Sequence, residues 1–167
     1  MQIVYTTDGF DIEDNGRILL RVPSNPAGTA WTTAEKEAYA TEMFNQMLET
    51  NYKEPARKAV ADDFVKELSA ISKPYPAEEK LSWDKQEAEA RAYLADNTTA
   101  TPFLDAMIAV TGEVKADIAA AIVAKADGYA AAVAAAVGKK RMLIGQIDAA
   151  TTSADVEAVK WNPDATI

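Results

Sequence analysis

The segment from Asp11 to Gly16 carries the residue types best suited to chemistry. Asp11, Glu13 and Asn15 place oxygen ligands at alternate positions before a glycine, as in the first half of a calcium-binding EF-hand loop. The twelfth position of that loop requires a bidentate glutamate, whereas this sequence has Val22. Asn-Gly is also a strong hairpin signal, because a type I′ turn needs positive φ at both central residues. We therefore favour a turn and keep a small ion-binding module using residues 11–16 as the alternative.

Two acidic clusters could supply paired carboxylates for acid–base chemistry. They comprise Asp62, Asp63 and Glu67 in one segment and Glu87 and Glu89 in another. Lys58 and Arg91 lie four residues from Asp62 and Glu87, which is typical of ion pairs on an exposed helix face. The chain has no cysteine and no histidine, and this excludes thiol nucleophiles, Ser–His pairs and the common zinc sites. We predict a protein that is not an enzyme, with no catalytic residue, metal ligand or cofactor.

The charge balance argues against a nucleic-acid partner. The chain has 17 lysines and arginines and 26 aspartates and glutamates, which gives a formal net charge of −9. Phosphate backbones are therefore repelled on average. The run Lys139-Lys140-Arg141 is the one basic candidate. Adjacent residues on a helix point about 100° apart, so these three side chains do not form a stripe.

A membrane partner is not expected either. Gly128–Gly138 is an uncharged, alanine-rich stretch of 11 residues, and a spanning helix needs about 20. The opening residues 1–5 are followed by Asp8 rather than by an apolar run, so we expect no secretory signal.

The first thirty residues predict a small β element. Three β-branched or aromatic runs, at 3–5, 10–12 and 17–22, are separated by Asp8-Gly9 and Asn15-Gly16. A two-stranded hairpin is marginal by itself, so it must pack on helices, on a second copy or on another protein. Residues 23–28 contain two prolines and a glycine and predict a linker.

Everything after Trp31 has helical spacing. We expect a helix from a Thr32–Glu35 capping box to about Thr50, and a second with Pro55 in its first turn. These two helices either continue through a kink or form a tight hairpin. The stiff connector 73–76 is the best internal boundary.

Later helices are predicted from their end signals. Ser82 should cap a helix that Leu81 staples, Thr101-Pro102 should open a short helix stopped by Gly112, and Thr152 with Asp155 should open the last. Between them we expect a long helix over residues 113–149, with glycines where it could bend. The fold class is mainly α, a helical hairpin or bundle with an N-terminal β-hairpin element. The division is 1–31 β element and linker, 32–72 helical segment, and 73–167 alanine-rich module.

Side chains that could bind a partner are apolar or aromatic. Trp31, Trp83 and Trp161 lie near segment ends, where each can plug a core or anchor an interface. The candidate partner-binding residues are Phe10, Ile18, Leu20, Trp31, Trp83 and Trp161. Alanine-rich helices permit close approach but bury little area. We therefore expect either an intramolecular helical hairpin or a helix that binds another protein or a second copy in a homo-oligomer.

The helical part of the chain shows a family resemblance. It is carried by WDKQEAEARAYLAD at 83–96, ATPFLD at 100–105, IDAATT at 147–152 and VEAVKW at 156–161, with Gly112, Lys125, Tyr129 and Gly138 between them. These residues resemble the helical C-terminal region of tail-fibre-associated proteins of tailed bacteriophages and prophages, often labelled tail-fibre assembly proteins. The resemblance covers about 80 residues. The N-terminal element does not match the front end of that family.

The resemblance implies a function without catalysis. The expected role is a tailed-phage tail protein that docks on the tail fibre or baseplate as a structural component of the virion. The alternative is a tail-fibre assembly chaperone that is not retained in the particle. In both cases the resemblance implies synthesis in the host cytoplasm, and it offers no catalytic residue.

Overall fold

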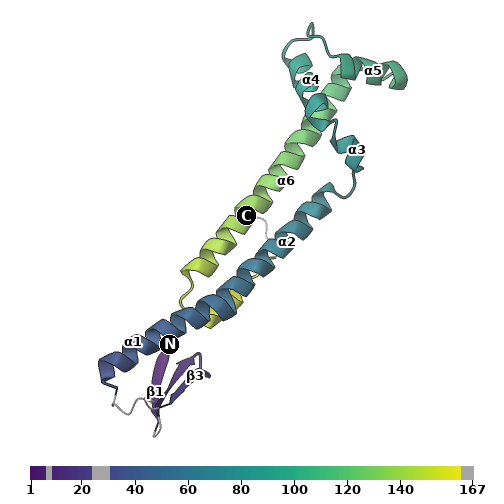
Figure 1. The fold of residues 1–167 in the computed structure, drawn as a ribbon. Coiled ribbons are helices and arrows are strands. Elements are labelled where there is room, and N and C mark those ends of the chain that lie inside the picture. Colours follow the sequence, from purple (N-terminus) through teal and green to yellow (C-terminus); the bar gives the residue numbers. More distant parts are fainter. Residues whose placement is uncertain (7–8, 24–30, 163–167) are drawn as a thin grey trace. The chain divides into compact units, whose positions relative to one another are not determined.

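The computed structural model describes residues 1–6, 9–23 and 31–162. The chain is mainly helical, at 71%, with a small N-terminal three-stranded antiparallel sheet (Figure 1). The predicted fold class is confirmed. The expected linker at 23–28 lies outside the described residues except for Pro23, which ends the last strand.

The sheet has the strand order β1-β2-β3. Its strands are β1 (Gln2–Thr6), β2 (Gly9–Asp14) and β3 (Arg17–Pro23). Asn15 and Gly16 have φ of 51° and 75° and form the two-residue turn between β2 and β3, as the Asn-Gly signal predicts. Gly9 begins β2 with φ 153°, and a Cβ there would lie 1.9 Å from the carbonyl oxygen of Val22, so glycine is required at this position.

One continuous helical segment follows. It consists of α1 (Thr33–Met47), the π-helix η1 (Leu48–Lys53) and α2 (Glu54–Ser72). The Thr32–Glu35 capping box is present, as predicted. The continuous alternative is therefore the correct one. Pro55 lacks an N–H and clashes with the carbonyl four residues earlier, and the wider turn of η1 immediately before it accommodates this defect.

Four short or medium helices and one long helix follow within the described residues. They are α3 (Ala77–Lys80), α4 (Trp83–Ala95), α5 (Pro102–Thr111), α6 (Lys115–Ala149) and α7 (Ser153–Ala158). Gly112 ends α5 with φ 71°, and Thr152 caps α7 by accepting from the backbone N–H of Asp155. The long helix α6 runs without interruption through its three glycines.

The predicted start of α4 is confirmed, with Ser82 at its N-cap position, but the expected capping hydrogen bond and the staple are wrong. Ser82 has helical backbone angles and makes no side-chain capping bond; its hydroxyl donates to the carbonyl of Glu79 instead, at 2.7 Å. The reason is that α3 ends at Lys80, two residues before Ser82, so the hydroxyl of Ser82 satisfies the last turn of α3. Leu81 is 87% exposed and staples nothing.

The chain divides into two compact units. Within the described residues, unit 1 comprises Met1–Phe64 and residues 139–162, and unit 2 comprises Val65–Gly138. Both units draw on α2 and α6, so each combines segments that are far apart in the sequence. The boundaries predicted after residues 31 and 72 were placed where the composition and the expected secondary structure change along the sequence. They stay a prediction.

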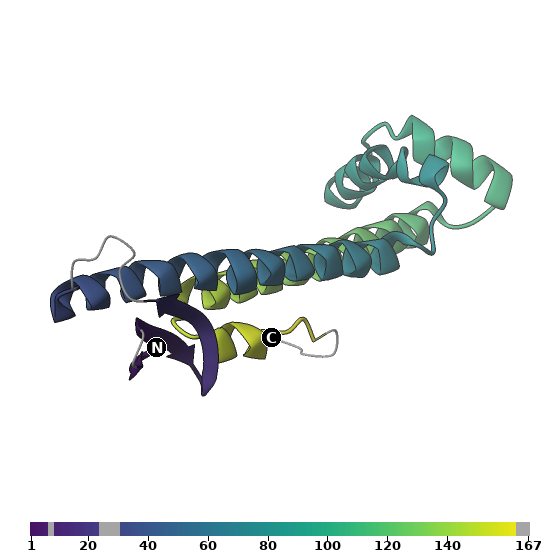
Figure 2. The same ribbon diagram turned by 60° about the horizontal axis from the view of Figure 1, so that its bottom comes forward.

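Unit 1 is built around the sheet, the α1–η1 segment and α7. In Figure 2 the sheet and α7 lie beside α1 and η1. Its core contains large side chains from all of these elements: Phe10, Ile12, Val22, Phe44, Leu48, Val60, Leu143, Ile147 and Val156. Unit 2 has a smaller core, made of Ala90, Leu104, Ile118 and Ala119.

Candidate functional site

The two edges of the N-terminal sheet differ in how well they are protected. The β1 edge reads Gln2-Ile3-Val4-Tyr5-Thr6 and carries no charge and no proline. Val4 and Tyr5 are exposed, and among the described residues no further strand pairs with β1. An uncharged, exposed edge strand presents free backbone donors and acceptors to another chain.

The β3 edge has three features that discourage pairing. Arg17 and Arg21 place charges on it, Pro23 ends it, and the register shifts between Ile12 and Glu13. That shift sets Ile18, Leu19 and Leu20 opposite only Ile12 and Glu13, which is a β-bulge. Charges, proline and bulges are common means of protecting an edge strand.

The structure separates the residues predicted to bind a partner at the sheet. Phe10 is 2% exposed and packs edge-to-face on Trp31 and Tyr39, so its side chain belongs to the core. Leu20 packs against the same core. Trp31 is half-buried, and its indole N–H has no partner within the described part of the chain. Ile18 is 51% exposed and is accessible to a partner.

The acidic segment at 11–16 is engaged by the protein itself. Asp11 accepts two hydrogen bonds of 2.9 Å from its cross-strand neighbour Arg21, and the hydrogen bonds lower the pKa of Asp11. Asn15 and Gly16 form the turn. Within the described residues no group of three acidic side chains is placed to hold a metal ion. The arrangement is that of a turn.

Asp14 joins the sheet to the C-terminal helix. Its carboxylate is buried, accepts from the backbone N–H of Ser153 at 2.7 Å and lies 3.6 Å from the α-amino group of Met1. Burial alone would raise the pKa of Asp14, but the hydrogen bonds from Ser153 and the nearby ammonium outweigh burial and lower it. Ser153 is the first residue of α7, where a negative charge is favourable.

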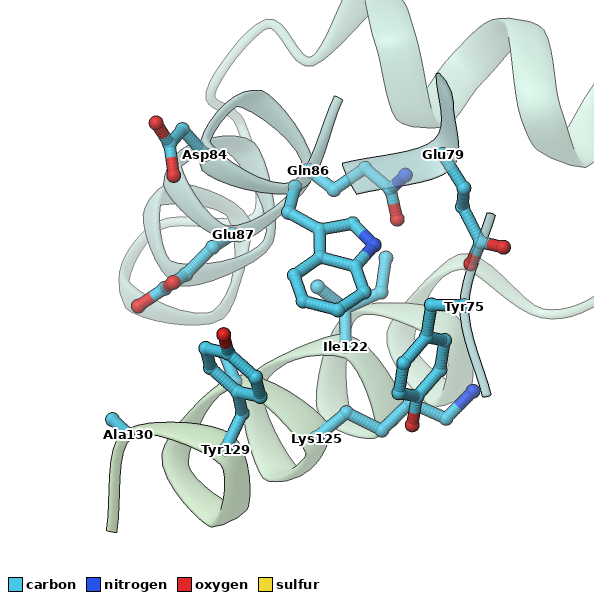
Figure 3. Close-up of a pocket in the computed structure, with 11 residues that line it drawn as sticks. Tyr75, Glu79, Asp84, Gln86, Glu87, Ile122, Lys125, Tyr129 and Ala130 are labelled. Carbon is cyan, nitrogen blue, oxygen red and sulfur yellow. The ribbon is translucent and has the colours of Figure 1, made fainter. Parts of the chain in front are cut away.

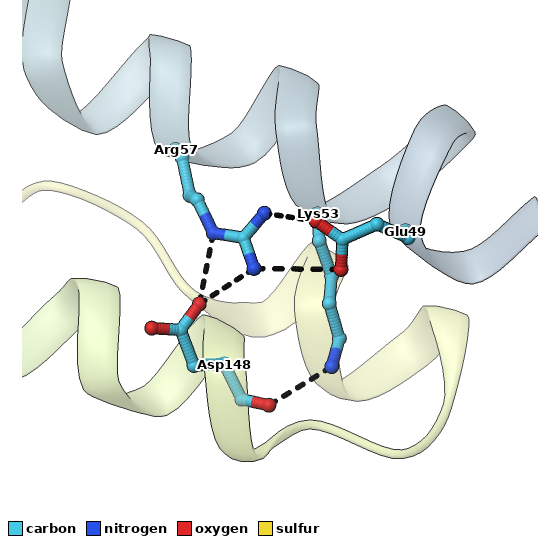
Figure 4. Close-up of polar contacts among 4 residues, drawn as sticks. All are labelled: Glu49, Lys53, Arg57 and Asp148. Carbon is cyan, nitrogen blue, oxygen red and sulfur yellow. Dashed lines mark hydrogen bonds and ion pairs between the residues drawn. The ribbon is translucent and has the colours of Figure 1, made fainter. Parts of the chain in front are cut away.

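Arg57 connects η1 to the end of α6 (Figure 4). Its guanidinium pairs with Glu49 and with Asp148, at 2.6 Å to the latter. Lys53 donates to the backbone carbonyl of Asp148 at 2.9 Å. These hydrogen bonds raise the pKa of Arg57 and lower that of Glu49. The network links η1, α2 and the end of α6.

Trp161 lies at a groove in unit 1. The groove, of about 370 Å³, is lined by residues of η1, α2 and the C-terminal segment. Trp161 packs against Phe64 with ring centroids 6.2 Å apart, and Lys139 lies 4.8 Å above its ring. Lys139 is buried, and Lys140 lies over the Phe64 ring. Two members of the basic run therefore lie over neighbouring aromatic rings.

Trp83 forms the centre of an aromatic cluster in unit 2. Its ring centroid lies 4.9 Å from that of Tyr75 and 5.3 Å from that of Tyr129, at interplanar angles of 85° and 75°. A pocket of about 230 Å³ opens beside these rings. Figure 3 shows Tyr75 and Tyr129 on opposite sides of it, with Ile122 between them. Sequence reasoning singled out Trp83 but missed the two tyrosines, because they come from a connector and from α6.

The acidic clusters make local ion pairs. Asp62 pairs with Lys58 at 2.7 Å, and Glu87 pairs with Arg91 at 2.8 Å. Arg91 also pairs with Asp127. Glu89 has a role that its sequence context did not indicate: its carboxylate accepts from the backbone N–H groups of Phe103 and Leu104, at 2.8 and 3.0 Å. It thereby caps the start of α5.

One helix among the described residues is long and apolar enough to cross a membrane. It is α6, where an 18-residue window reaches a mean hydropathy of 1.5 and is 11% buried. Length and composition are the only grounds for this match, and alanine supplies most of the hydropathy. The expectation of no membrane partner stays a prediction.

Three comparisons with known proteins found no match. No protein-family model, no curated protein and no solved structure matches the chain.

Proposed function

We propose that the protein is a non-enzymatic component of a bacteriophage tail that docks on the tail fibre or baseplate through the β1 edge of its N-terminal sheet. The observation that carries the docking mode is the contrast between the two sheet edges. β3 has charges, a proline and a bulge, whereas Gln2–Thr6 has none of these. Addition of a partner strand to such an edge is a common way to bind an extended segment.

The phage assignment is supported by the residues that resemble the helical region of tail-fibre-associated proteins, at 83–96, 100–105, 147–152 and 156–161. A sheet in front of a helical module suits an adaptor, in which one part binds and another presents or oligomerises. The lack of histidine and cysteine and the ion-paired carboxylates are consistent with a role that needs no catalysis.

The test of docking is co-purification of the tagged protein with tail fibre or baseplate proteins of the phage that encodes it. Val4→Lys places a charge on the exposed β1 edge and should reduce co-purification by about tenfold or more. Ile18→Lys makes the same change at an exposed apolar position of β3 and should leave binding intact. Both substitutions are at exposed sites, and thermal melting confirms that each variant is folded.

The controls also separate the alternatives. Loss of binding only in Ile18→Lys would move the docking surface to β3, and unchanged binding in both variants would contradict sheet-mediated docking. Mass spectrometry of purified particles then distinguishes two roles. Presence in the particle supports a structural component, whereas a stable complex with the fibre protein and absence from particles supports an assembly chaperone.

A further inference from the structure

The pocket beside Trp83 has three aromatic walls. Tyr75, Trp83 and Tyr129 meet nearly at right angles, and all three line the cavity. The face of an aromatic ring is the negative part of its quadrupole and attracts cations. Proteins recognise quaternary ammonium groups with cages of aromatic rings. All the lining residues belong to unit 2, so the pocket is complete within one unit.

The charges around the pocket favour a cation. Glu79, Asp84 and Glu87 line it against a single basic residue, Lys125. Glu87 is already paired with Arg91. Within the part of the chain that the structure describes, no ion pair or hydrogen bond engages the carboxylates of Glu79 and Asp84. Two unpaired carboxylates in the lining of this aromatic pocket create a site of negative potential.

The size of the pocket limits the ligand. At about 230 Å³ it is below the range of about 300–1,000 Å³ typical of pockets for drug-sized molecules. It therefore suits one small head group rather than a nucleotide or an oligosaccharide. Ile122, Ala126 and Ala130 provide an apolar floor, which suits the methyl groups of an alkylated ammonium.

From these features we infer that the pocket binds an organic cation of the quaternary ammonium class. Trp83 and the two tyrosines contact its methyl groups, and Glu79 and Asp84 balance its charge. The cation is either a free small molecule, such as choline, or an alkylated lysine side chain of a binding partner. This site is separate from the β1 edge, and its test is independent of tail docking.

The experiment is a titration of the full-length, isotope-labelled protein followed by NMR of the tryptophan indole N–H signals. Choline chloride is added at constant ionic strength, with sodium chloride as reference. We expect saturable shifts of the Trp83 signal with a Kd of about 1 mM or tighter. Trp31 and Trp161 lie in unit 1 and serve as internal controls. Absence of a shift at Trp83 overturns the inference.

Substitutions test the chemistry of the site. Trp83→Leu keeps an apolar side chain but removes the central ring and should weaken binding about tenfold or more, read from the Tyr129 signals. Glu79→Gln should weaken binding several-fold, whereas Glu78→Gln makes the same charge change on α3 at a residue that does not line the pocket and should not. Equal weakening by both glutamines overturns the inference, because it indicates only general charge attraction.

Ligand analogues complete the test. 3,3-Dimethyl-1-butanol has the shape of choline without its charge and should bind at least about tenfold more weakly. Equal binding of this alcohol identifies an ordinary apolar pocket and overturns the inference. A peptide containing trimethyllysine distinguishes the sources: tighter binding than choline assigns the site to a partner's side chain, and weaker binding assigns it to a free small molecule.

Discussion

Unit 1 and unit 2 bury their apolar residues in different ways. The core of unit 1 combines aromatic and branched side chains from strands and helices that are far apart in the sequence. In unit 2 the buried cluster has two alanines and only two large residues, Leu104 and Ile118. Complete burial of a large apolar side chain contributes about 1.5–3 kcal/mol, and alanine contributes much less. Unit 1 therefore has the larger source of stability.

The two units also differ in the large apolar side chains that they leave exposed. Unit 2 leaves Leu81 and Val110 almost fully exposed, at 87% and 88%. Buried polar groups do not separate the units in this way. Unit 1 buries Asp14, which is paired with Ser153. Each unit also buries one polar atom without a partner in the described residues, the indole N–H of Trp31 in unit 1 and the hydroxyl of Thr101 in unit 2. The comparison indicates that unit 1 is the more stable unit, whereas the stability of unit 2 depends on a few large buried side chains.

The largest effect should come from removing a main core side chain of each unit. Leu104→Ala and Phe10→Ala should each cost about 3–5 kcal/mol. Leu104 is the only fully buried large side chain in the described core of unit 2, so its loss should expose the amides of α4 and α5 to hydrogen exchange while unit 1 stays protected. Phe10→Ala should instead expose the amides of the sheet and α7 to exchange, while unit 2 stays protected.

Hydrogen exchange followed by mass spectrometry measures both variants. Leu81→Ala is the control and should change stability by less than about 0.5 kcal/mol, because the side chain is exposed. If either variant loses protection uniformly across both units, the two units unfold together. The difference between their cores would then not give them different stabilities.

The second effect concerns Asp14 and acid. Asp14→Ala leaves the N–H of Ser153 without its acceptor and should destabilise unit 1 by about 1–3 kcal/mol. The pKa of Asp14 is lowered below 3.8 in the folded state, so the folded form binds fewer protons than the unfolded form. The stability that it contributes is complete above pH 3.8 and is lost as the pH falls through the lower folded pKa.

The same reasoning distinguishes the units at low pH. Carboxyl groups with lowered pKa are Asp11, Asp14, Glu35 and Glu49 in unit 1 and Asp96 in unit 2. Denaturation measured between pH 5 and about pH 2.5 should show a steeper loss for unit 1. Asp14→Asn should reduce that slope, and an unchanged slope would remove Asp14 from this explanation.

Local signals predicted much of the fold. The Asn15-Gly16 turn, the Thr32–Glu35 capping box and the stop at Gly112 each depend on a few adjacent residues whose backbone preferences are strong. Pro55 could not be interpreted so simply, because its effect depends on whether the preceding turn can widen. Ser82 lies at the predicted start of α4, but its hydroxyl donates to Glu79 of α3, because only Leu81 and Ser82 separate the two helices.

The candidate sites were less predictable because they depend on long-range pairing. Asp148 lies 91 residues from Arg57, and no sequence period relates them. Trp83 was identifiable as a candidate, but its neighbours Tyr75 and Tyr129 are placed by the packing of unit 2. Phe10 and Ile18 belong to one hairpin and have similar chemistry, yet one is buried and one exposed because the bulge changes the face that β3 presents.

A third pair of substitutions should have effects of opposite sign within unit 2. Gly112 has φ 71°, where a Cβ costs about 1–2 kcal/mol, so Gly112→Ala should destabilise the end of α5. Gly128 lies inside α6, and a Cβ there meets nothing within 4 Å. Gly128→Ala should therefore stabilise the helix by about 0.5–1 kcal/mol. Thermal unfolding measures both, and destabilisation by Gly128→Ala would indicate a close contact at that position.

The smallest effects should come from the two arginines that each bridge two carboxylates. Arg57 joins Glu49 and Asp148 with 31% of its side chain exposed, and Arg91 joins Glu87 and Asp127 with 46% exposed. Arg57→Met should cost about 1 kcal/mol at low salt, and Arg91→Met should cost less, because solvent screens the more exposed network. Raising the salt concentration should reduce both differences. A larger loss for Arg91→Met, measured by urea denaturation, would show that polar contacts support unit 2 where its small core does not.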